Sequence, residues 1–232
     1  MEYQPEDQLQ PDSQPPSDDD IAPPPVASYK KLPSTLPRVD ISDKVVVIGY
    51  SGSGKTTLLD YFVKHGAPTP RYIIDTVNYF SYVPSYNYSG VTKCKSPASG
   101  QICMKLHSEE QFEALLWYLN HRKDKFFLVV DEIDRYTNVN HLRREVKLFL
   151  EEGRNFGRGG IFAVRRVGFL NKSILGNSHY LFVFKINNYR DLQYLSMISS
   201  VDVLNLEYHD EHSFYIIDLH TSKVLGEYKV AI

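Results

Sequence analysis

The chain has 232 residues, 42% of them hydrophobic and 23% charged, and a formal net charge of −2 at pH 7. This length suits one medium domain with a tail, or at most two small domains. No apolar run reaches the roughly 18 residues of a bilayer-spanning helix, and no basic segment followed by an apolar run marks a secretory signal. Cys94 and Cys103 are too few for a disulfide framework, which favours a reducing compartment. We therefore expect a cytoplasmic protein without a membrane span.

The first 38 residues differ in composition from the rest of the chain. Residues 1–20 hold seven acidic side chains and no lysine or arginine, and nine of the thirteen prolines precede residue 38. Such a segment cannot bury enough apolar surface to fold alone. We predict a disordered, acidic, proline-rich leader over 1–38, either a docking arm or a solubilising tail, and one folded domain over 39–232. Without residues 1–20 the chain has 26 basic and 21 acidic side chains, a net charge of +5.

A glycine-rich segment between an apolar run and a helical pattern is the first chemical motif. Residues 45–48 are apolar, and GYSGSGKTT follows them, then apolar residues at helical spacing. This is the strand, loop and helix context of the GxxxxGK[ST] phosphate loop. The glycine amides are expected to form an anion site, Lys55 to reach the β- and γ-phosphates, and Thr56 to hold Mg²⁺. The predicted nucleotide-binding residues are Gly49, Tyr50, Ser51, Gly52, Ser53, Gly54, Lys55, Thr56 and Thr57.

A tyrosine-rich segment separates the next two predicted strands. Residues 71–74 form a short predicted strand that ends at Asp75, and residues 101–106 form another. For 76–100 we expect a loop or small hairpin inserted in the core, whose tyrosines suit either stacking on bases or packing within the loop. Ser108 and Gln111 have the spacing of a capping box, and the helix that they open carries apolar residues at i, i+3, i+4 and i+7 from Phe112.

A second motif is the apolar run 126–130, which ends in Asp131 and Glu132. Such a run predicts a central parallel strand that is buried on both faces. In an NTPase the Asp holds Mg²⁺ and the adjacent Glu polarises the attacking water, so this pair favours hydrolysis over phosphate transfer to a small molecule. A solvent-exposed strand end is the alternative. Asp134 is expected nearer the surface, as a loop charge.

Helices and strands alternate in the second half of the chain. We predict a charged helix from about Asn140 to Arg154, strands at 161–165 and 180–184, a helix around Leu195, and a hairpin of strands 214–219 and 224–229. This alternation predicts a doubly wound α/β domain, with ligands at the carboxyl ends of the strands.

Three arginines are further candidates for catalysis. Arg165 and Arg166 close a predicted strand at the level of the γ-phosphate, where a guanidinium can sense that group or stabilise the transition state. At least one of the two is expected to face solvent or pair with an acid instead. Arg154 follows the charged helix, where it can act on a neighbouring subunit's nucleotide or complement the helix dipole.

The segment EGRNFGRGGIFAVRRVGFL, continued through NSHYLFVFKINNYRDLQYL, resembles the corresponding region of the FtsK–HerA superfamily of P-loop motors. In those proteins the strand after the Walker B motif typically ends in Ala-Thr-Gln-Arg-Pro; here the sequence is Ala-Val-Arg-Arg-Val over 163–167. The compact size and the Arg-Arg variant are most similar to the genome-packaging ATPases of tailless, internal-membrane, double-jelly-roll viruses. The resemblance covers roughly residues 43 to 200.

This resemblance implies a fold, an activity and a set of partners. The fold is a three-layer αβα P-loop NTPase core of the additional-strand, catalytic-Glu type with a mainly parallel sheet, to which the predicted C-terminal β-hairpin adds. Lys55 and Thr56 match Walker A, Asp131 and Glu132 match Walker B, and Arg165 stands where many members have a sensor Gln. Arg154 matches the region that offers a trans-acting Arg. The implied ligands are ATP and Mg²⁺, and the implied assembly is a ring, usually hexameric, that pumps double-stranded DNA.

We therefore predict an ATP-hydrolysing DNA translocase, most like a viral packaging motor that works in the host cytoplasm or with capsid or vertex proteins. A cellular or plasmid DNA-transfer ATPase and a nucleotide-dependent switch with little turnover are the alternatives. Two groups of basic residues are candidates for DNA contact, although each also suits an ordinary solvated face. They are Arg143, Arg144 and Lys147, and Arg122, Lys123 and Lys125.

Overall fold

The computed structural model describes residues 38–75, 78–87, 100–122, 124–208 and 210–230. Cys94, Lys123 and the predicted leader up to residue 37 lie outside them, so the boundary at 38 stays a prediction. The strands are β1 (Lys44–Ile48), β2 (Arg71–Ile74), β3 (Ser85–Asn87), β4 (Gln101–Lys105), β5 (Phe126–Val130), β6 (Arg158–Val164), β7 (Tyr180–Phe184), β8 (Ser213–Asp218) and β9 (Lys223–Lys229). The α-helices are α1 (Lys55–Tyr61), α2 (Glu109–His121), α3 (Arg144–Glu152), α4 (Lys172–Gly176) and α5 (Tyr189–Ser199).

All nine described strands form one sheet, in the order β3-β4-β2-β5-β6-β1-β7-β8-β9. Strands β1 to β7 run parallel, whereas β8 and β9 are antiparallel to their neighbours. Strand β6 lies between β1, which leads into the glycine-rich loop, and β5, which ends at Asp131. The predicted additional strand between the Walker A and Walker B strands is thus confirmed.

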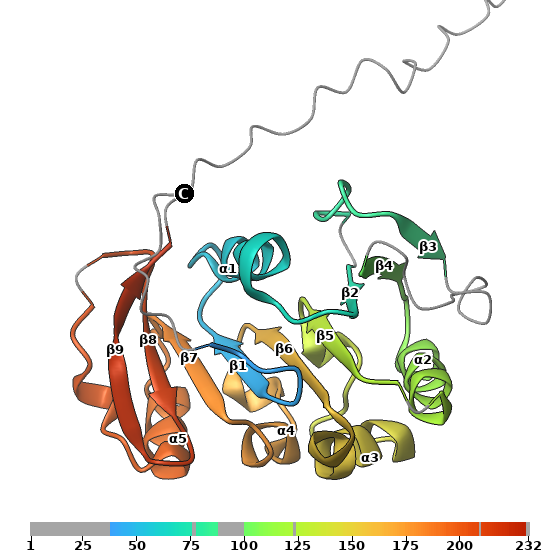
Figure 1. Ribbon diagram of the computed structural model, residues 1–232. Coiled ribbons are helices and arrows are strands. Elements are labelled where there is room, and N and C mark those ends of the chain that lie inside the picture. Colours follow the sequence, from blue (N-terminus) through green and yellow to red (C-terminus); the bar gives the residue numbers. More distant parts are fainter. Residues whose placement is uncertain (1–37, 76–77, 88–99, 123, 209, 231–232) are drawn as a thin grey trace, which may run out of the picture.

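Two apolar cores divide the molecule into three layers (Figure 1). Because side chains alternate along a strand, Val45 and Val47 face the core that contains α1, and Val46 and Ile48 face the core beneath α2 to α5. All five residues of β1 and of β5 are buried, as expected for central parallel strands. The predicted αβα fold with a mainly parallel sheet is confirmed.

One glycine fixes where the chain enters β1. A Cβ atom added at Gly159 would lie 2.2 Å from the backbone oxygen of Asp43 and 2.6 Å from that of Ile41. The next amide, Gly160, donates a 2.8 Å hydrogen bond to the Asp43 oxygen. Only a residue without a side chain allows this close approach.

The structure refines several predicted elements. The Ser108 cap is confirmed, since its hydroxyl accepts a hydrogen bond from the Gln111 amide. Within 76–100, the described part forms no hairpin: β3 pairs in parallel with β4. The predicted C-terminal hairpin is present, and β8 also pairs with β7, so the hairpin extends the main sheet.

The charged helix begins later than predicted, at Arg144 rather than near Asn140. The Asn171 side chain donates hydrogen bonds to the backbone oxygens of Asn138 and Val139, and the Asn138 side chain accepts one from the Asn140 amide. These bonds hold the asparagine-containing segment outside a helix. No helix among the described residues is both long and apolar enough to cross a membrane.

Candidate nucleotide-binding site

The carboxyl ends of β1, β5 and β6 enclose a cavity of about 280 Å³. In parallel α/β sheets this edge is where ligands bind. The wall of the cavity brings together most of the predicted site: Ser51, Gly52, Gly54, Lys55, Thr56, Thr57, Asp131, Glu132 and Arg165, with Ala163 and Val164 of β6. Gly49, Tyr50 and Ser53 belong to the same loop without lining this cavity.

The glycine-rich loop has a backbone that few other sequences can adopt. Gly52 and Gly54 have φ angles of 86° and 104°, in the left-handed region that favours glycine. Gly54 is the N-cap of α1, so the amides of the first helical turn face the cavity, where an anion is stabilised. The predicted anion site is therefore geometrically available.

Lys55 is held by the loop that precedes it. Its Nζ donates hydrogen bonds of 2.8 Å and 2.7 Å to the backbone oxygens of Gly49 and Tyr50, and the residue is only 8% exposed. Burial lowers the lysine pKa from 10.5 to about 8, and the nearby Arg165 acts in the same direction, whereas Asp131 acts against it. A bound phosphate would supply the negative charge that this buried cation lacks.

Thr56 and Asp131 form a pair with the chemistry of a magnesium site. The Thr56 hydroxyl donates a 2.8 Å hydrogen bond to Asp131 Oδ2, although 75 residues separate the two. Asp131 is 7% exposed, and burial raises the pKa of its carboxyl, while the Thr56 bond and the charge of Lys55 lower it. A hydroxyl and a carboxylate beside a phosphate loop are the oxygen ligands that Mg²⁺ prefers, so these residues fit the ion.

Glu132 is held between two arginines. Its carboxylate forms ion pairs with Arg165, at the end of β6, and with Arg135, in the 3₁₀ turn Ile133–Arg135. The Glu132 backbone has φ 57° and ψ 59°, a left-handed conformation that costs a non-glycine residue about 1–3 kcal/mol. Arg135 was not among the predicted site residues; its i+3 spacing from Glu132 was the signal for it.

The two neighbouring arginines of 165–166 face different surroundings. Arg165 lines the nucleotide cavity, whereas Arg166 lies 3.5 Å from Asp191 of α5 and over the ring of Phe169. Both arginines pair with acids, so the expectation that at least one does so is met. Arg166 also lines a separate cavity of about 290 Å³ that shares Ser51 and Arg165 with the nucleotide cavity.

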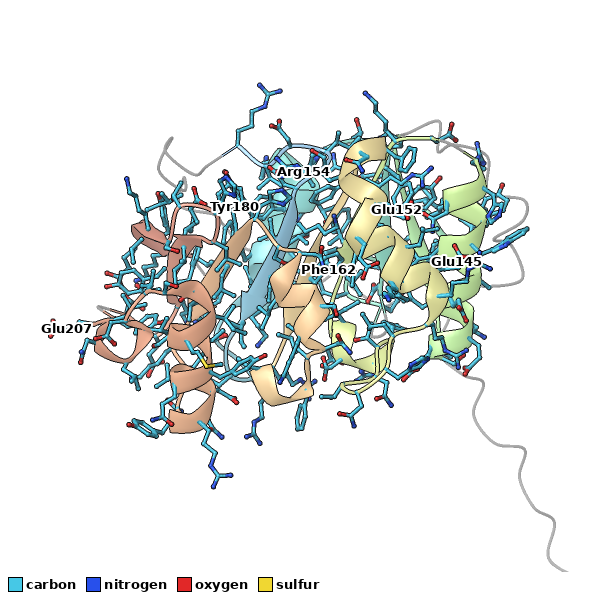
Figure 2. The ribbon with its side chains drawn as sticks, turned by 90° about the horizontal axis from the view of Figure 1, so that it is seen from below. Glu145, Glu152, Arg154, Phe162, Tyr180 and Glu207 are labelled. Atoms are coloured by element: carbon cyan, nitrogen blue, oxygen red, sulfur yellow. The ribbon has the colours of Figure 1, made fainter. Side chains whose placement is uncertain are left out.

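Arg154 lies away from the other predicted site residues. It belongs to the 3₁₀ turn Gly153–Phe156, which precedes β6, and lines a cavity with Lys44 and His179 at the amino-terminal edge of the sheet. Figure 2 shows it at the same end of the molecule as Tyr180, the first residue of β7. Arg154 therefore does not contact the phosphate loop of its own chain, and its action on a neighbouring copy stays a prediction.

Several side chains near the site were interpreted differently or missed in the sequence. Asp134 is not simply a surface charge: its Oδ1 is buried without a hydrogen bond partner among the described residues, and burial raises its pKa. The phenol groups of Tyr79 and Tyr82 bond to Thr57 and Asp60 of α1, which supports the packing interpretation for these two rings. The ring of His212, just before β8, lies 3.4 Å from the Ser53 oxygen, so the C-terminal hairpin contacts the phosphate loop.

No family model and no curated protein sequence matches the chain. Solved structures match its fold. The genome packaging NTPase B204 from Sulfolobus turreted icosahedral virus 2, in complex with ATP-gammaS, aligns with a TM-score of 0.66 at 19% identity over 84% of this chain and 100% of that one. B204, the DNA-packaging ATPase from Sulfolobus turreted icosahedral virus, aligns with a TM-score of 0.65 at 19% identity, over 82% of this chain and 98% of that one.

A third solved structure also matches the fold. EssC (ATPases 2 and 3) from Geobacillus thermodenitrificans aligns with a TM-score of 0.54 at 13% identity, over 82% of this chain and 39% of that one. At such identities these likenesses concern the fold. They agree with the resemblance to FtsK–HerA ATPases noted in the sequence, and the chain has the P-loop NTPase fold of genome-packaging ATPases.

Proposed function

We propose that this chain is the ATP-hydrolysing subunit of a motor that translocates double-stranded DNA, as in the packaging of a viral genome. The observation that carries the proposal is the convergence of Lys55, the Thr56–Asp131 pair and Glu132 on one cavity. The fold of the neighbours, whose names state NTPase or ATPase activity and genome or DNA packaging, supports it.

The residues divide the chemistry of hydrolysis among them. Lys55 exchanges its carbonyl partners for the β- and γ-phosphates, and Thr56 and Asp131 hold the metal. Mg²⁺, when bound with ATP, neutralises phosphate charge and favours an in-line geometry. Glu132 accepts a proton from the attacking water while the water oxygen bonds to the γ-phosphorus. The bond from that phosphorus to ADP breaks, and the charge remains on ADP and phosphate.

The Glu132 ion pairs add a condition to this mechanism. A carboxylate that is neutralised by Arg165 and Arg135 is a poor base for water. The γ-phosphate offers Arg165 a dianionic alternative, so its arrival would release Glu132 toward the water. In this proposal Arg165 acts as the predicted sensor, through an ion pair with Glu132 that the sequence did not identify.

DNA contact is the part of the proposal that rests most on the neighbours. Arg143 pairs with Glu109, Glu110 and Glu113, and Lys147 lies 3.9 Å from Glu151. Arg122 pairs with Asp124, and Lys123 lies outside the described residues. These pairs neutralise much of the two groups of basic residues that were predicted to meet DNA.

The surface beside the nucleotide cavity is a further candidate for DNA contact, although Arg166 there also pairs with an acid, Asp191. The cavity next to it is lined by Arg166, Asn187 and Asn188, and Tyr189 beside them is 61% exposed. A guanidinium, amides and an exposed ring are groups that nucleic-acid sites use. DNA bound at Arg166 would contact the residue next to Arg165, and so could affect the nucleotide cavity. Assembly into a ring, contact with capsid or vertex proteins and a place in the host cytoplasm belong to the same proposal.

One observation favours a second function, a nucleotide-dependent switch. With Glu132 held by two arginines, the chain is built to bind ATP before it can hydrolyse it. If the arginines keep Glu132 when ATP is bound, occupancy alone would be the signal. Turnover distinguishes the switch from the motor.

The test is steady-state ATP hydrolysis by the full chain, with and without double-stranded DNA, beside Lys55→Ala. We expect DNA to stimulate turnover and the variant to abolish it. ATP binding without turnover, with or without DNA, would contradict the motor and support the switch. Equal turnover in the Lys55→Ala variant would contradict the assigned site.

A further inference from the structure

A second cavity, larger than the nucleotide cavity, lies at the opposite edge of the sheet. Its volume is about 410 Å³, and we call it the amino-edge cavity. Four elements surround it: the carboxyl end of α3, the carboxyl end of α4, the helix α5, and the turn that joins β8 to β9. Four basic residues line it: Lys44, Arg154, His179 and His220. Figure 2, which looks onto α3, α4 and α5, shows Arg154 at this end.

Lys44 is the buried member of this group. It is 1% exposed, and it lies on the same face of β1 as Val46, toward α3. Its ammonium stands 5.6 Å from the ring centroid of Phe149 and, in the described part of the chain, has no hydrogen bond and no ion pair. A buried cation normally has an anionic partner, because desolvation is otherwise too costly.

The acids near the cavity are directed elsewhere. Glu151 lines it but lies 3.9 Å from Lys147, on the outer face of α3. Asp43 accepts a 2.8 Å hydrogen bond from the Asp40 amide and approaches His179 only to 3.9 Å. Neither carboxylate contacts the Lys44 ammonium, which therefore has no paired acid among the described residues around the cavity.

His179 is oriented as a donor. Its Nδ1 accepts a 3.1 Å hydrogen bond from the Lys44 amide, which leaves the proton on Nε2. Burial lowers the His179 pKa, and the charges of Arg154 and Lys44 lower it further against the opposite effect of Asp43. Burial likewise lowers the Lys44 pKa to about 8, with Arg154 acting in the same direction and Asp43 against it. The Lys44 ammonium lacks the counter-charge that an anion would bring, and the neutral His179 ring has a donor in Nε2–H.

We propose that the amino-edge cavity binds a phosphate group, either free or carried on a small molecule. Lys44 supplies the buried positive charge, and the imidazole of His179 supplies a hydrogen-bond donor. Arg154 and His220 line the entrance of the cavity. Charge-assisted hydrogen bonds of this kind are the strong ones, and arginine is well shaped for phosphate. The site is distinct from the phosphate loop, because Lys44 begins β1 and the loop follows its other end.

A simpler explanation for the same cations predicts a different result. The carboxyl ends of α3 and α4 point to this edge, and cations there offset helix dipoles without any ligand. In that case the cavity takes up no phosphate. Binding therefore decides between the two explanations.

The experiment uses the full chain with the phosphate loop saturated by AMPPCP and Mg²⁺, and it titrates inorganic phosphate by calorimetry. Histidine side-chain NMR reports the place of binding. We expect one phosphate per chain and shifts of the His179 and His220 signals. Lys44→Met should weaken binding tenfold or more. The matched control Lys172→Met, at the exposed first residue of α4 and outside the lining of this cavity, should leave the affinity unchanged. AMP titrated in place of phosphate separates the sources: tighter binding of AMP indicates a phosphate carried on a small molecule.

No saturable uptake, or equal uptake by Lys44→Met, would overturn the proposal. If Lys44→Met does not fold, His220→Gln in the exposed turn is the second variant, and it should weaken binding several-fold. If AMPPCP does not bind, the proposed nucleotide site is wrong. Phosphate titration of the wild type and of Lys44→Met still tests the amino-edge cavity, because the variant should bind one phosphate fewer per chain. The two proposals thus fail separately.

Discussion

The two edges of the sheet each contain a buried lysine, and the surroundings of the two differ. Lys55 and Lys44 have the same lowered pKa of about 8, in both cases chiefly through burial. Lys55 donates to two backbone oxygens of the glycine-rich loop, whereas Lys44 has only the face of an aromatic ring. The glycine-rich loop thus supplies Lys55 with backbone acceptors, whereas the start of β1 supplies none to the Lys44 ammonium among the described residues.

The largest expected effect on ATP binding and turnover comes from removing Lys55, the buried lysine at the edge of the sheet where the parallel strands end (the carboxyl edge). Lys55→Ala should lower ATP affinity at least tenfold and reduce turnover to background, because the β- and γ-phosphates lose their charged partner. Fluorescent-nucleotide titration measures the affinity, with Lys147→Met as the control. Undiminished affinity would mean that the loop backbone alone holds the nucleotide.

Glu132→Gln tests the proposed general base, which lies at the same edge of the sheet. The amide keeps the size of the side chain but cannot accept the proton, so turnover should fall about 10²–10⁴-fold while ATP binding remains. Single-turnover hydrolysis beside equilibrium binding measures the two effects. A loss of both would assign Glu132 to binding rather than to proton transfer.

Arg165→Gln should lower turnover about 10–10³-fold, because a guanidinium beside the γ-phosphate stabilises transition-state charge. Arg135→Gln removes the other partner of Glu132 and none of the cavity wall, so it should change turnover only a few-fold. Rates at saturating ATP compare the two. Equal losses would show that both arginines serve Glu132 alone.

The smallest effect concerns the pH dependence of stability at the amino edge. Lys44 has a pKa of about 8 in the folded chain, against an ordinary value of 10.5. Between these values the unfolded chain binds more protons, so the free energy of unfolding should rise with pH. From pH 8 to 9.5 the wild type should gain on the order of 1–2 kcal/mol relative to Lys44→Met. Urea unfolding of both proteins at the two pH values measures the difference, and parallel curves would contradict the shift.

The sequence predicted the carboxyl edge far better than the amino edge, and the reason is physical. The phosphate loop is one contiguous segment with obligatory glycines, and the Asp131-Glu132 pair ends an apolar run that nothing but a buried strand explains. The amino edge has no such motif. Lys44 precedes an apolar strand as any strand-initial lysine does, and only the packing of α3 over it makes it buried.

The ion pairs of Glu132 show a second limit. Arg165 comes from β6 and Arg135 from a turn after β5, and their meeting depends on sheet order and on a left-handed backbone at Glu132. Local sequence patterns predict neither the sheet order nor the left-handed backbone at Glu132. Arg165 and Arg166 are adjacent in sequence and both line the cavity beside the nucleotide cavity, but of the two only Arg165 also lines the nucleotide cavity.

Strand β6 sets the working distance of the site. Neighbouring strands lie about 4.8 Å apart, so one strand inserted between β1 and β5 sets their backbones roughly 10 Å apart. The side chains of Thr56 and Asp131 bridge that distance with a 2.8 Å hydrogen bond. The glycines at the start of β6 seat it tightly against the chain that enters β1, so the gap is fixed by the sheet itself rather than by loops. The inserted strand therefore sets the backbone spacing that the side chains of the two motifs have to bridge.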